Sequence, residues 1–460
     1  MTILNRSTST NPYNLGSLPQ KDLYKKLEQL YYNSDDVYSS VQSAAYDAGT
    51  WVENIKPIRT VVNRSVEFYV GKLLPGDISK VGISTDNPSV KEAIEQVWKW
   101  SNFGAQKQVA ARYLTLYGDL FVKVVTSESK VYFEIIEPEY VTDFSADNRG
   151  YITTFRMDIP IVVDGNHKTY TEYWSKPDNY FAVWTHEQGS NAKLDTLGEP
   201  DNFGFLEQLG IDFVPIVHVK FKDMGDKNGV SCVYHALSKI TEANREATRL
   251  AELLFRYNKP IWAVSANAND AQGRPVPAPK LKAGTDNDIS LKDDSLIYLP
   301  GTSKIDSLIP NINYADALAI LNSMMDELEQ DLPELRYYSM QDADLSGKAI
   351  KLLLAGAADR AEEARGNFLA GLSRLDEMAL TIGKYMGFFS NLGFYENGDF
   401  DHSVEAPEMF ALTIEEEANL INLLVGAGMP LAQAMRLAGY SEEFIEQTKL
   451  EGQNEQPPRV

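Results

Sequence analysis

Cysteine is almost absent from this 460-residue sequence. Cys232 is the only one, which excludes an internal disulfide framework and a cysteine-based zinc site, and we expect it to be a small buried residue in a reducing compartment. No apolar run reaches membrane-spanning length, so no membrane partner is expected. The first residues, MTILNRSTSTN, lack the basic-then-apolar order of a signal peptide.

Motifs for binding nucleotides are also missing. A phosphate-binding P-loop requires serine or threonine directly after Gly-Lys, but leucine, alanine and tyrosine follow the Gly-Lys pairs at 71–72, 347–348 and 383–384. No Gly-x-Gly-x-x-Gly follows a predicted strand, so a dinucleotide-binding fold has no support. The five histidines include no pair at i, i+3 or i, i+4. We therefore predict a protein that is not an enzyme, with no catalytic residue, metal site or cofactor.

Basic residues are few compared with acidic ones. The chain has 43 Lys and Arg against 65 Asp and Glu, a net charge of -22. A protein that holds nucleic acid by its phosphates is normally rich in Lys and Arg, because the release of counterions drives that affinity. Two interpretations remain open: the charge keeps the protein soluble, or DNA passes by this protein without being held.

The first half of the chain predicts an α+β region. Apolar residues at helical spacing predict helices over 21–32, 58–74, 90–101 and 104–117. Alternating runs rich in Tyr, Phe, Val and Thr then predict an antiparallel sheet, with strands over 120–125, 130–136, 151–159, 169–174, 181–186 and 213–221.

The second half is mainly helical. A helix is predicted over 230–257, followed by an insert rich in Pro and Gly with β-like runs at 261–266, 295–300 and 304–310. A second helix leads to Pro333, and residues 334–346 read as a loop. The longest helix is predicted from about 347 to 390. At 1.5 Å per residue it would reach roughly 60 Å, so we expect neighbouring subunits to bury its apolar stripe.

The segment after residue 391 is acidic, with thirteen Asp and Glu against three Lys and Arg. Helices are predicted over 414–425, 430–438 and 441–449, and the last residues have the composition of a disordered tail.

This order of elements resembles that of phage portal proteins of the siphophage type. The matching motifs are Asn54-Ile55-Lys56-Pro57-Ile58, Tyr117-Gly118-Asp119, Gly229-Val230-Ser231 and Leu345-Ser346-Gly347-Lys348-Ala349. The resemblance covers nearly the whole chain. It implies a wing at 1–229, stem helices at 230–257 and 312–331, a β-containing clip at 258–311, a tunnel loop at 332–346, a long wing helix at 347–390 and a helical crown with its tail at 391–460.

The resemblance also implies partners and a location. Portal proteins form a dodecameric ring at one capsid vertex, and double-stranded DNA enters and leaves through its axis. The expected partners are the terminase large subunit, a head–tail adaptor, and the major capsid and scaffold proteins. The protein would be assembled in the host bacterial cytoplasm and reside in the virion.

Two groups of residues are the candidate sites. The DNA channel is expected to involve Arg336, Tyr337, Tyr338, Lys348 and Lys351. The clip residues expected to dock the terminase or the adaptor are Arg274, Lys280, Lys282 and Lys292.

Two alternative functions remain open. One is a structural or scaffold protein of a virion that is not a portal. The other is a metal-dependent enzyme acting on nucleic acid, with Asp342 and Asp344 as the metal ligands.

Overall fold

The computed structural model describes residues 19–34, 61–78, 81–127, 129–257, 262–266, 272–274, 296–300, 305–307, 314–339, 352–394, 400–407, 409, 414–437 and 445. The predicted α+β class is confirmed. Most of the buried apolar side chains form one continuous core, which lies mainly in the part of the chain expected to be the wing and extends to the adjoining ends of the two expected stem helices.

Four helices from the N-terminal part of the chain contribute to this core, and the apolar spacing predicts all four. They are α1 (Gln20–Tyr32), α3 (Val61–Leu73), α4 (Pro88–Trp100) and α5 (Phe103–Tyr117). The α4 helix begins at Pro88 because the Asn87 side chain accepts a hydrogen bond from the Ser89 N–H, and proline suits the first helical position. The α5 helix ends at Gly118, whose φ of 84° favours glycine.

Two antiparallel sheets follow α5. The first has the order β3-β2-β9 and consists of β2 (Asp119–Ser127), β3 (Lys130–Ile136) and β9 (Ile216–Lys220). The second has the order β4-β5-β6-β7-β8 and consists of β4 (Val141–Ala146), β5 (Ile152–Val163), β6 (Asn166–Ser175), β7 (Tyr180–His186) and β8 (Asn202–Phe205). The sequence pattern predicts all of these strands except β4, whose buried and exposed residues do not alternate, and β8, which has only four residues.

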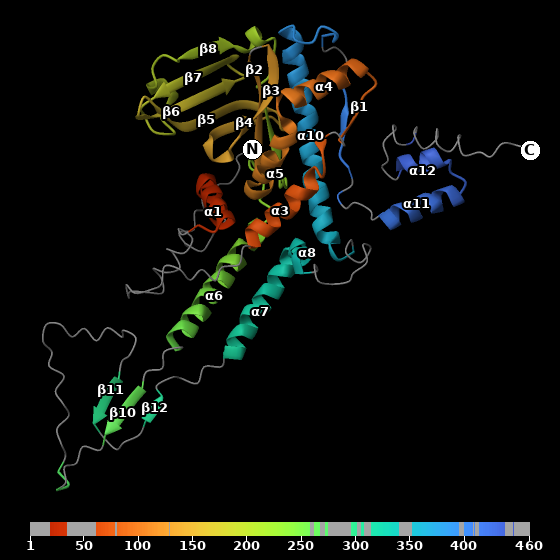
Figure 1. The fold of residues 1–460 in the computed structure, drawn as a ribbon. Coiled ribbons are helices and arrows are strands. Elements are labelled where there is room, and N and C mark those ends of the chain that lie inside the picture. Colours follow the sequence, from red (N-terminus) through yellow and green to blue (C-terminus); the bar gives the residue numbers. More distant parts are fainter. Residues whose placement is uncertain are drawn as a thin grey trace, which may run out of the picture.

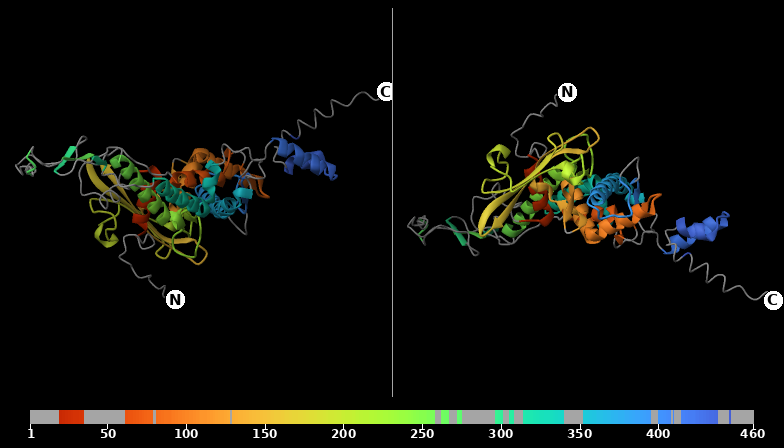
Figure 2. Two further views of the ribbon diagram at one scale, coloured as in Figure 1. Left: turned by 90° about the horizontal axis from the view of Figure 1, so that it is seen from below. Right: turned by 90° about the horizontal axis from the view of Figure 1, so that it is seen from above.

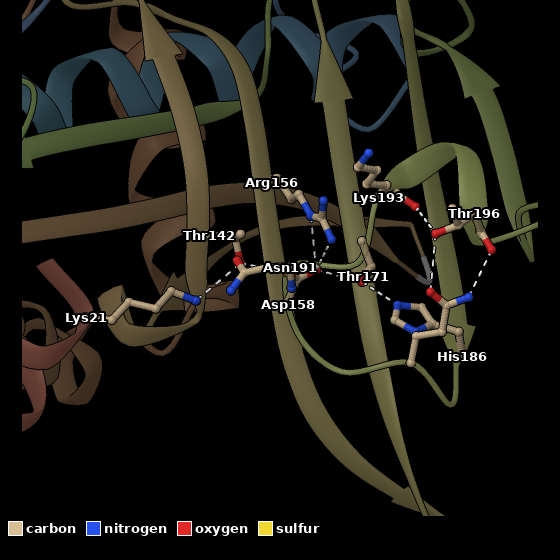
Figure 3. A network of polar contacts seen from close by, with 10 residues as sticks. Lys21, Thr142, Arg156, Asp158, Thr171, His186, Asn191, Lys193 and Thr196 are labelled. Carbon is tan, nitrogen blue, oxygen red and sulfur yellow. Dashed lines mark hydrogen bonds and ion pairs between the residues drawn. The ribbon is translucent and has the colours of Figure 1, made fainter. Parts of the chain in front are cut away.

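A buried carboxylate ties a loop to one face of the five-stranded sheet. Asp158 on β5 accepts hydrogen bonds from Arg156, Thr142, Thr171 and the Asn191 N–H, at distances of 2.7 to 3.2 Å (Figure 3). Burial alone would raise the pKa of Asp158, but the bonds from the Asn191 N–H and the two threonines hold it below its usual range. The loop after β7 is thereby fixed across the sheet.

A small sheet joins distant parts of the chain. Strand β1 (Gly82–Ser84) pairs antiparallel with β13 (Ser403–Glu405), more than 300 residues away. Beside this pair, the His402 Nε2 atom lies 3.3 Å from the Asp376 carboxylate, which also accepts from Trp98 Nε1 at 2.9 Å. This contact fixes the segment that leads to the C-terminal helices.

The long helix α10 (Ala355–Tyr385) corrects two predictions. It ends at Tyr385, before the predicted end at residue 390, and its 31 residues span about 46 Å. The predicted start at 347 lies outside the described residues. The expectation that neighbouring subunits bury its stripe is also wrong. Its apolar residues are buried within the subunit, against β9, α3, α4 and the strands β2 and β3.

Both helices that are predicted to form the stem are present as helices, and we keep the name stem helices for them. Helix α6 (Leu237–Tyr257) begins seven residues later than expected, after the short 3-10 helix η6 (Tyr234–Ala236), and α7 (Tyr314–Asp331) returns beside it (Figure 1). At their far end lies a three-stranded sheet with the order β11-β10-β12. Its strands match the three predicted runs and are β10 (Trp262–Ala266), β11 (Leu296–Pro300) and β12 (Ile305–Ser307).

The described C-terminal part is a helical pair. Helices α11 (Ile414–Gly426) and α12 (Leu431–Leu437) agree with the predicted positions, and the third predicted helix, 441–449, lies outside the described residues except for residue 445. Figure 2 shows the pair on the opposite side of α10 from the five-stranded sheet.

Candidate functional site

The two stem helices are fixed to the body at their roots. Lys239 Nζ on α6 lies 2.9 Å from Glu327 and 2.8 Å from Asp331, both on α7. His235 Nε2 and Arg360 Nη1 both donate to the carbonyl oxygen of Asp331, at 2.9 and 3.0 Å. Because Arg360 belongs to α10, these bonds connect both stem helices to the helix that runs through the core.

Two of the motifs that carry the family resemblance meet where the wing joins the stem. A Cβ atom on Gly229 would lie 2.1 Å from the carbonyl oxygen of Gly118, so only glycine fits there. The buried Asp119 carboxylate accepts from the Gly229 N–H at 2.6 Å, from the Tyr24 hydroxyl at 2.5 Å and from His218 Nε2 at 2.6 Å. The carboxylate thus holds the chain in position just before α6.

The segment after α7 differs from the predicted loop. Residues Pro333–Leu335 form the 3-10 helix η7, and Arg336–Ser339 form one turn of α-helix, α8. The loop prediction is wrong for these residues because the segment packs on α3, where it can complete helical turns. Its buried anchor is Glu334, which accepts from the Tyr69 hydroxyl at 3.1 Å. Burial raises the pKa of Glu334.

Tyr337 and Tyr338, two of the candidate channel residues, lie against α3. Tyr337 packs edge-on against Phe68, and Lys72 Nζ lies 5.8 Å from the Tyr337 ring centre. The Tyr338 hydroxyl donates to the Arg64 carbonyl at 3.0 Å, and the Arg64 guanidinium lies over the same ring. Both aromatic side chains therefore contact α3 of their own subunit.

The basic candidates are only partly placed. Arg336 lies on α8 with intermediate exposure, and Arg274 is exposed between β10 and β11. The side chains of Lys348, Lys351, Lys280, Lys282 and Lys292 lie outside the described residues, as do Asp342 and Asp344. Among the described residues, Arg336, Tyr337 and Tyr338 lie together on α8, and Arg274 is the one placed member of the clip group.

Sequence reasoning missed the two buried carboxylates that position these elements, Asp119 and Glu334. The Tyr117-Gly118-Asp119 motif was a signal for the first, but no local pattern distinguishes Glu334 from a solvent-exposed acid.

No arrangement typical of a catalytic centre is found in the described part of the chain. No three His, Cys, Asp or Glu side chains gather there in a way that could hold a metal ion. Cys232 is buried, and burial raises the pKa of its thiol, which disfavours the reactive thiolate. In the same part of the chain, no helix has the length and apolar character needed to cross a membrane.

Comparison with solved structures finds similar chains at low identity. A chain of the virion of native gene transfer agent (GTA) particle is 11% identical, with a TM-score of 0.41. A chain from the neck of empty GTA particle computed with C6 symmetry is 13% identical, with a TM-score of 0.42, and one from the neck of native GTA particle computed with C12 symmetry is 12% identical, with a TM-score of 0.41. Each match covers 91% of this chain and 93% of the other.

Sequence comparison identifies the family. No curated protein matches the chain. The model of the family described as phage portal protein, SPP1 Gp6-like, matches residues 19–406, from the start of α1 to the end of β13. This range includes α1 to α5, both large sheets, α6, α7, the strands between them and α10. The chain belongs to the SPP1 Gp6-like family of phage portal proteins.

Proposed function

We propose that twelve copies of this chain form a ring at one vertex of a phage capsid and that double-stranded DNA passes through its axis during packaging and ejection. The family match over residues 19–406 carries this proposal. As a portal protein the subunit has a structural role, and the force that moves DNA would come from a terminase motor bound from outside. The acidic composition supports a conduit, because negative walls repel the phosphate backbone and prevent DNA from sticking.

Exposed apolar side chains on two sides of α7 support assembly through the stem, since each subunit of a ring has two neighbours. Leu318 is 48% exposed and Ile320 is 59% exposed, whereas Leu321 and Leu328 of the same helix are buried against the subunit. Covering large exposed aliphatic side chains is favourable by roughly 25 cal/mol per Å², and a neighbouring subunit in a ring would cover them.

Imaging of the purified full-length protein tests the ring. We expect a closed ring with a central hole wide enough for duplex DNA. Replacing Leu318 and Ile320 together by glutamate should prevent ring formation and leave monomers, because charges would be buried in the interface. Val162→Glu, at an exposed apolar position on β5, is the matched control and should still form rings. Filaments or compact dimers of the unmodified protein would contradict the proposal.

We further propose that residues 332–346, the tunnel-loop segment, lie at the narrowest part of the channel. The contacts of Tyr337 and Tyr338 with α3 support a role as anchors of the segment. In this arrangement Arg336, together with Lys348 and Lys351 from the start of the long helix segment, would contact the DNA phosphates.

The clip is the proposed docking site for other proteins. It forms the far end of the stem, beyond α6 and α7 (Figure 1). Arg274 is exposed there, and we propose that it acts with Lys280, Lys282 and Lys292 to contact acidic surfaces of the terminase large subunit and later of the head–tail adaptor.

A further inference from the structure

Four aromatic rings form a strip across the edge of the five-stranded sheet. Tyr173 on β6 lies 5.7 Å from Tyr180 on β7, measured between ring centres. Tyr180 stacks on Phe203 of β8 at 5.5 Å, and Phe203 meets Phe205 edge-on at 5.3 Å. Phe203 is 51% exposed and Phe205 is 46% exposed. We call these four residues the aromatic strip.

The strip lies on the face of the sheet opposite to the local core. Successive side chains of a strand point to opposite faces, and Phe181 and Gly204 take the other face. There Phe181 stacks on the buried Trp174 at 4.7 Å, and a Cβ atom on Gly204 would lie 2.6 Å from the Phe181 ring. The core at this edge is therefore filled without the strip, so packing within the subunit does not account for Phe203 and Phe205.

The strip is accessible from the edge of the sheet. Strand β8 is the last strand of its sheet, and no described strand pairs with its outer side. It lies at the end of the body opposite to the stem and the clip (Figure 1). At the other end of the strip, Tyr173 lines a cavity of about 420 Å³ that Arg156 and Asn191 also line.

The surroundings of the strip are strongly acidic. From residue 176 to residue 212 the chain carries seven Asp and Glu against two Lys and no Arg. Asp178, Asp201 and Glu207 flank the strip and are exposed, and Lys176 lies 3.9 Å from a further acid, Asp212. Charge therefore disfavours two occupants. Nucleic acid would be repelled, and the same edge of a second copy would bring like charges together.

We propose that the aromatic strip binds a basic, extended segment of a partner protein. Arg or Lys side chains of that segment would lie over the exposed rings in cation–π contacts and pair with the flanking carboxylates. Its main chain could pair with the outer side of β8, as in other cases of strand addition. This site is distinct from the proposed docking site on the clip and lies at the opposite end of the molecule.

A peptide-binding measurement on the full-length protein tests the strip. The probe is a fluorescent peptide of alternating arginine and valine, and a peptide with glutamate in place of arginine is its charge control. We expect the arginine peptide alone to bind, with an affinity that falls as salt is added. Phe203→Ser combined with Phe205→Ser should weaken binding by about tenfold or more, the loss typical of central aromatic residues in interfaces.

The matched control is Tyr32→Ser, which removes an exposed aromatic ring outside the strip and should bind like the unmodified protein. Neutralising Asp178, Asp201 and Glu207 should weaken binding and reduce its salt dependence. Equal binding by the double phenylalanine variant, or equal binding of the glutamate peptide, would overturn the proposal. So would self-association that disappears in that variant, since a second copy would then occupy the strip. Thermal melting checks that each variant is folded, and ring imaging reports separately on the proposed function.

Discussion

Replacing Asp119 by alanine should strongly destabilise the junction between wing and stem. The Asp119 carboxylate is completely buried at the start of β2. It accepts hydrogen bonds from the Tyr24 hydroxyl, His218 Nε2 and the Gly229 N–H. These donors come from α1, β9 and the chain before α6, so a single side chain connects three parts of the molecule.

The size of the effect follows from the donors that lose their partner. A buried donor without a partner costs about 1–3 kcal/mol, and three of them are affected. Relaxation and entry of water would recover part of this loss. After this recovery, we expect the free energy of unfolding to fall by about 3–5 kcal/mol. A domain is typically stable by only about 5–15 kcal/mol.

Urea unfolding measures the free energy of unfolding of Asp119→Ala and of a matched control variant. The matched control is Asp143→Ala, because Asp143 pairs with Lys227 at 2.6 Å but both side chains are mostly exposed. The free energy of unfolding should fall by less than about 1 kcal/mol in Asp143→Ala. We also expect Asp119→Ala to form fewer closed rings, because the Gly229 N–H no longer holds the approach to α6. A loss for Asp119→Ala as small as that of the control would refute this reasoning.

Two further predictions concern pH and DNA packaging. Burial alone would lower the pKa of His402, but its hydrogen bonds to Asp376 and to the Phe400 carbonyl raise it, while burial raises the pKa of Asp376 to about 6. Both folded-state pKa values exceed the unfolded ones, so stability from this pair is present at low pH and is lost as pH rises above the unfolded pKa of Asp376, 3.8, and then above that of His402, 6.5. Thermal melting should show this decline in the unmodified protein, and the decline should vanish in the Asp376→Asn, His402→Gln double variant. Separately, Arg336→Glu should reduce the amount of packaged DNA in an in vitro packaging assay while rings still form, because a negative side chain repels phosphate.

Each of these two predictions has its own control. His235→Gln alters an exposed histidine that contacts a carbonyl oxygen, and it should keep the decline with pH. If the double variant still showed the full decline with pH, groups other than Asp376 and His402 would be responsible for it. For packaging, Arg149→Glu changes an exposed arginine on a wing turn and should leave the yield unchanged. Normal packaging by Arg336→Glu would remove this residue from the channel.

Local patterns in the sequence determined most of the secondary structure. Apolar spacing placed α1, α5, α7 and α11 within a few residues of their observed limits, because one buried face repeats every three or four residues in a helix. Alternation placed the long strands, because one face of a strand repeats every second residue. The failed search for nucleotide and metal motifs and the order of the elements pointed to a portal protein, and the family match confirms this.

Only the tertiary structure decided how these elements are used. The pairing of β1 with β13 depends on contacts between residues far apart in the sequence, which no local pattern encodes. The stripe of α10 looked like an interface between subunits, but β9 and α3 bury it within one chain. Asp119 and Asp143 look alike in the sequence, yet one is completely buried and the other is mostly exposed. Burial depends on what the whole fold places around a side chain, so the sequence predicted the elements and the packing decided their roles.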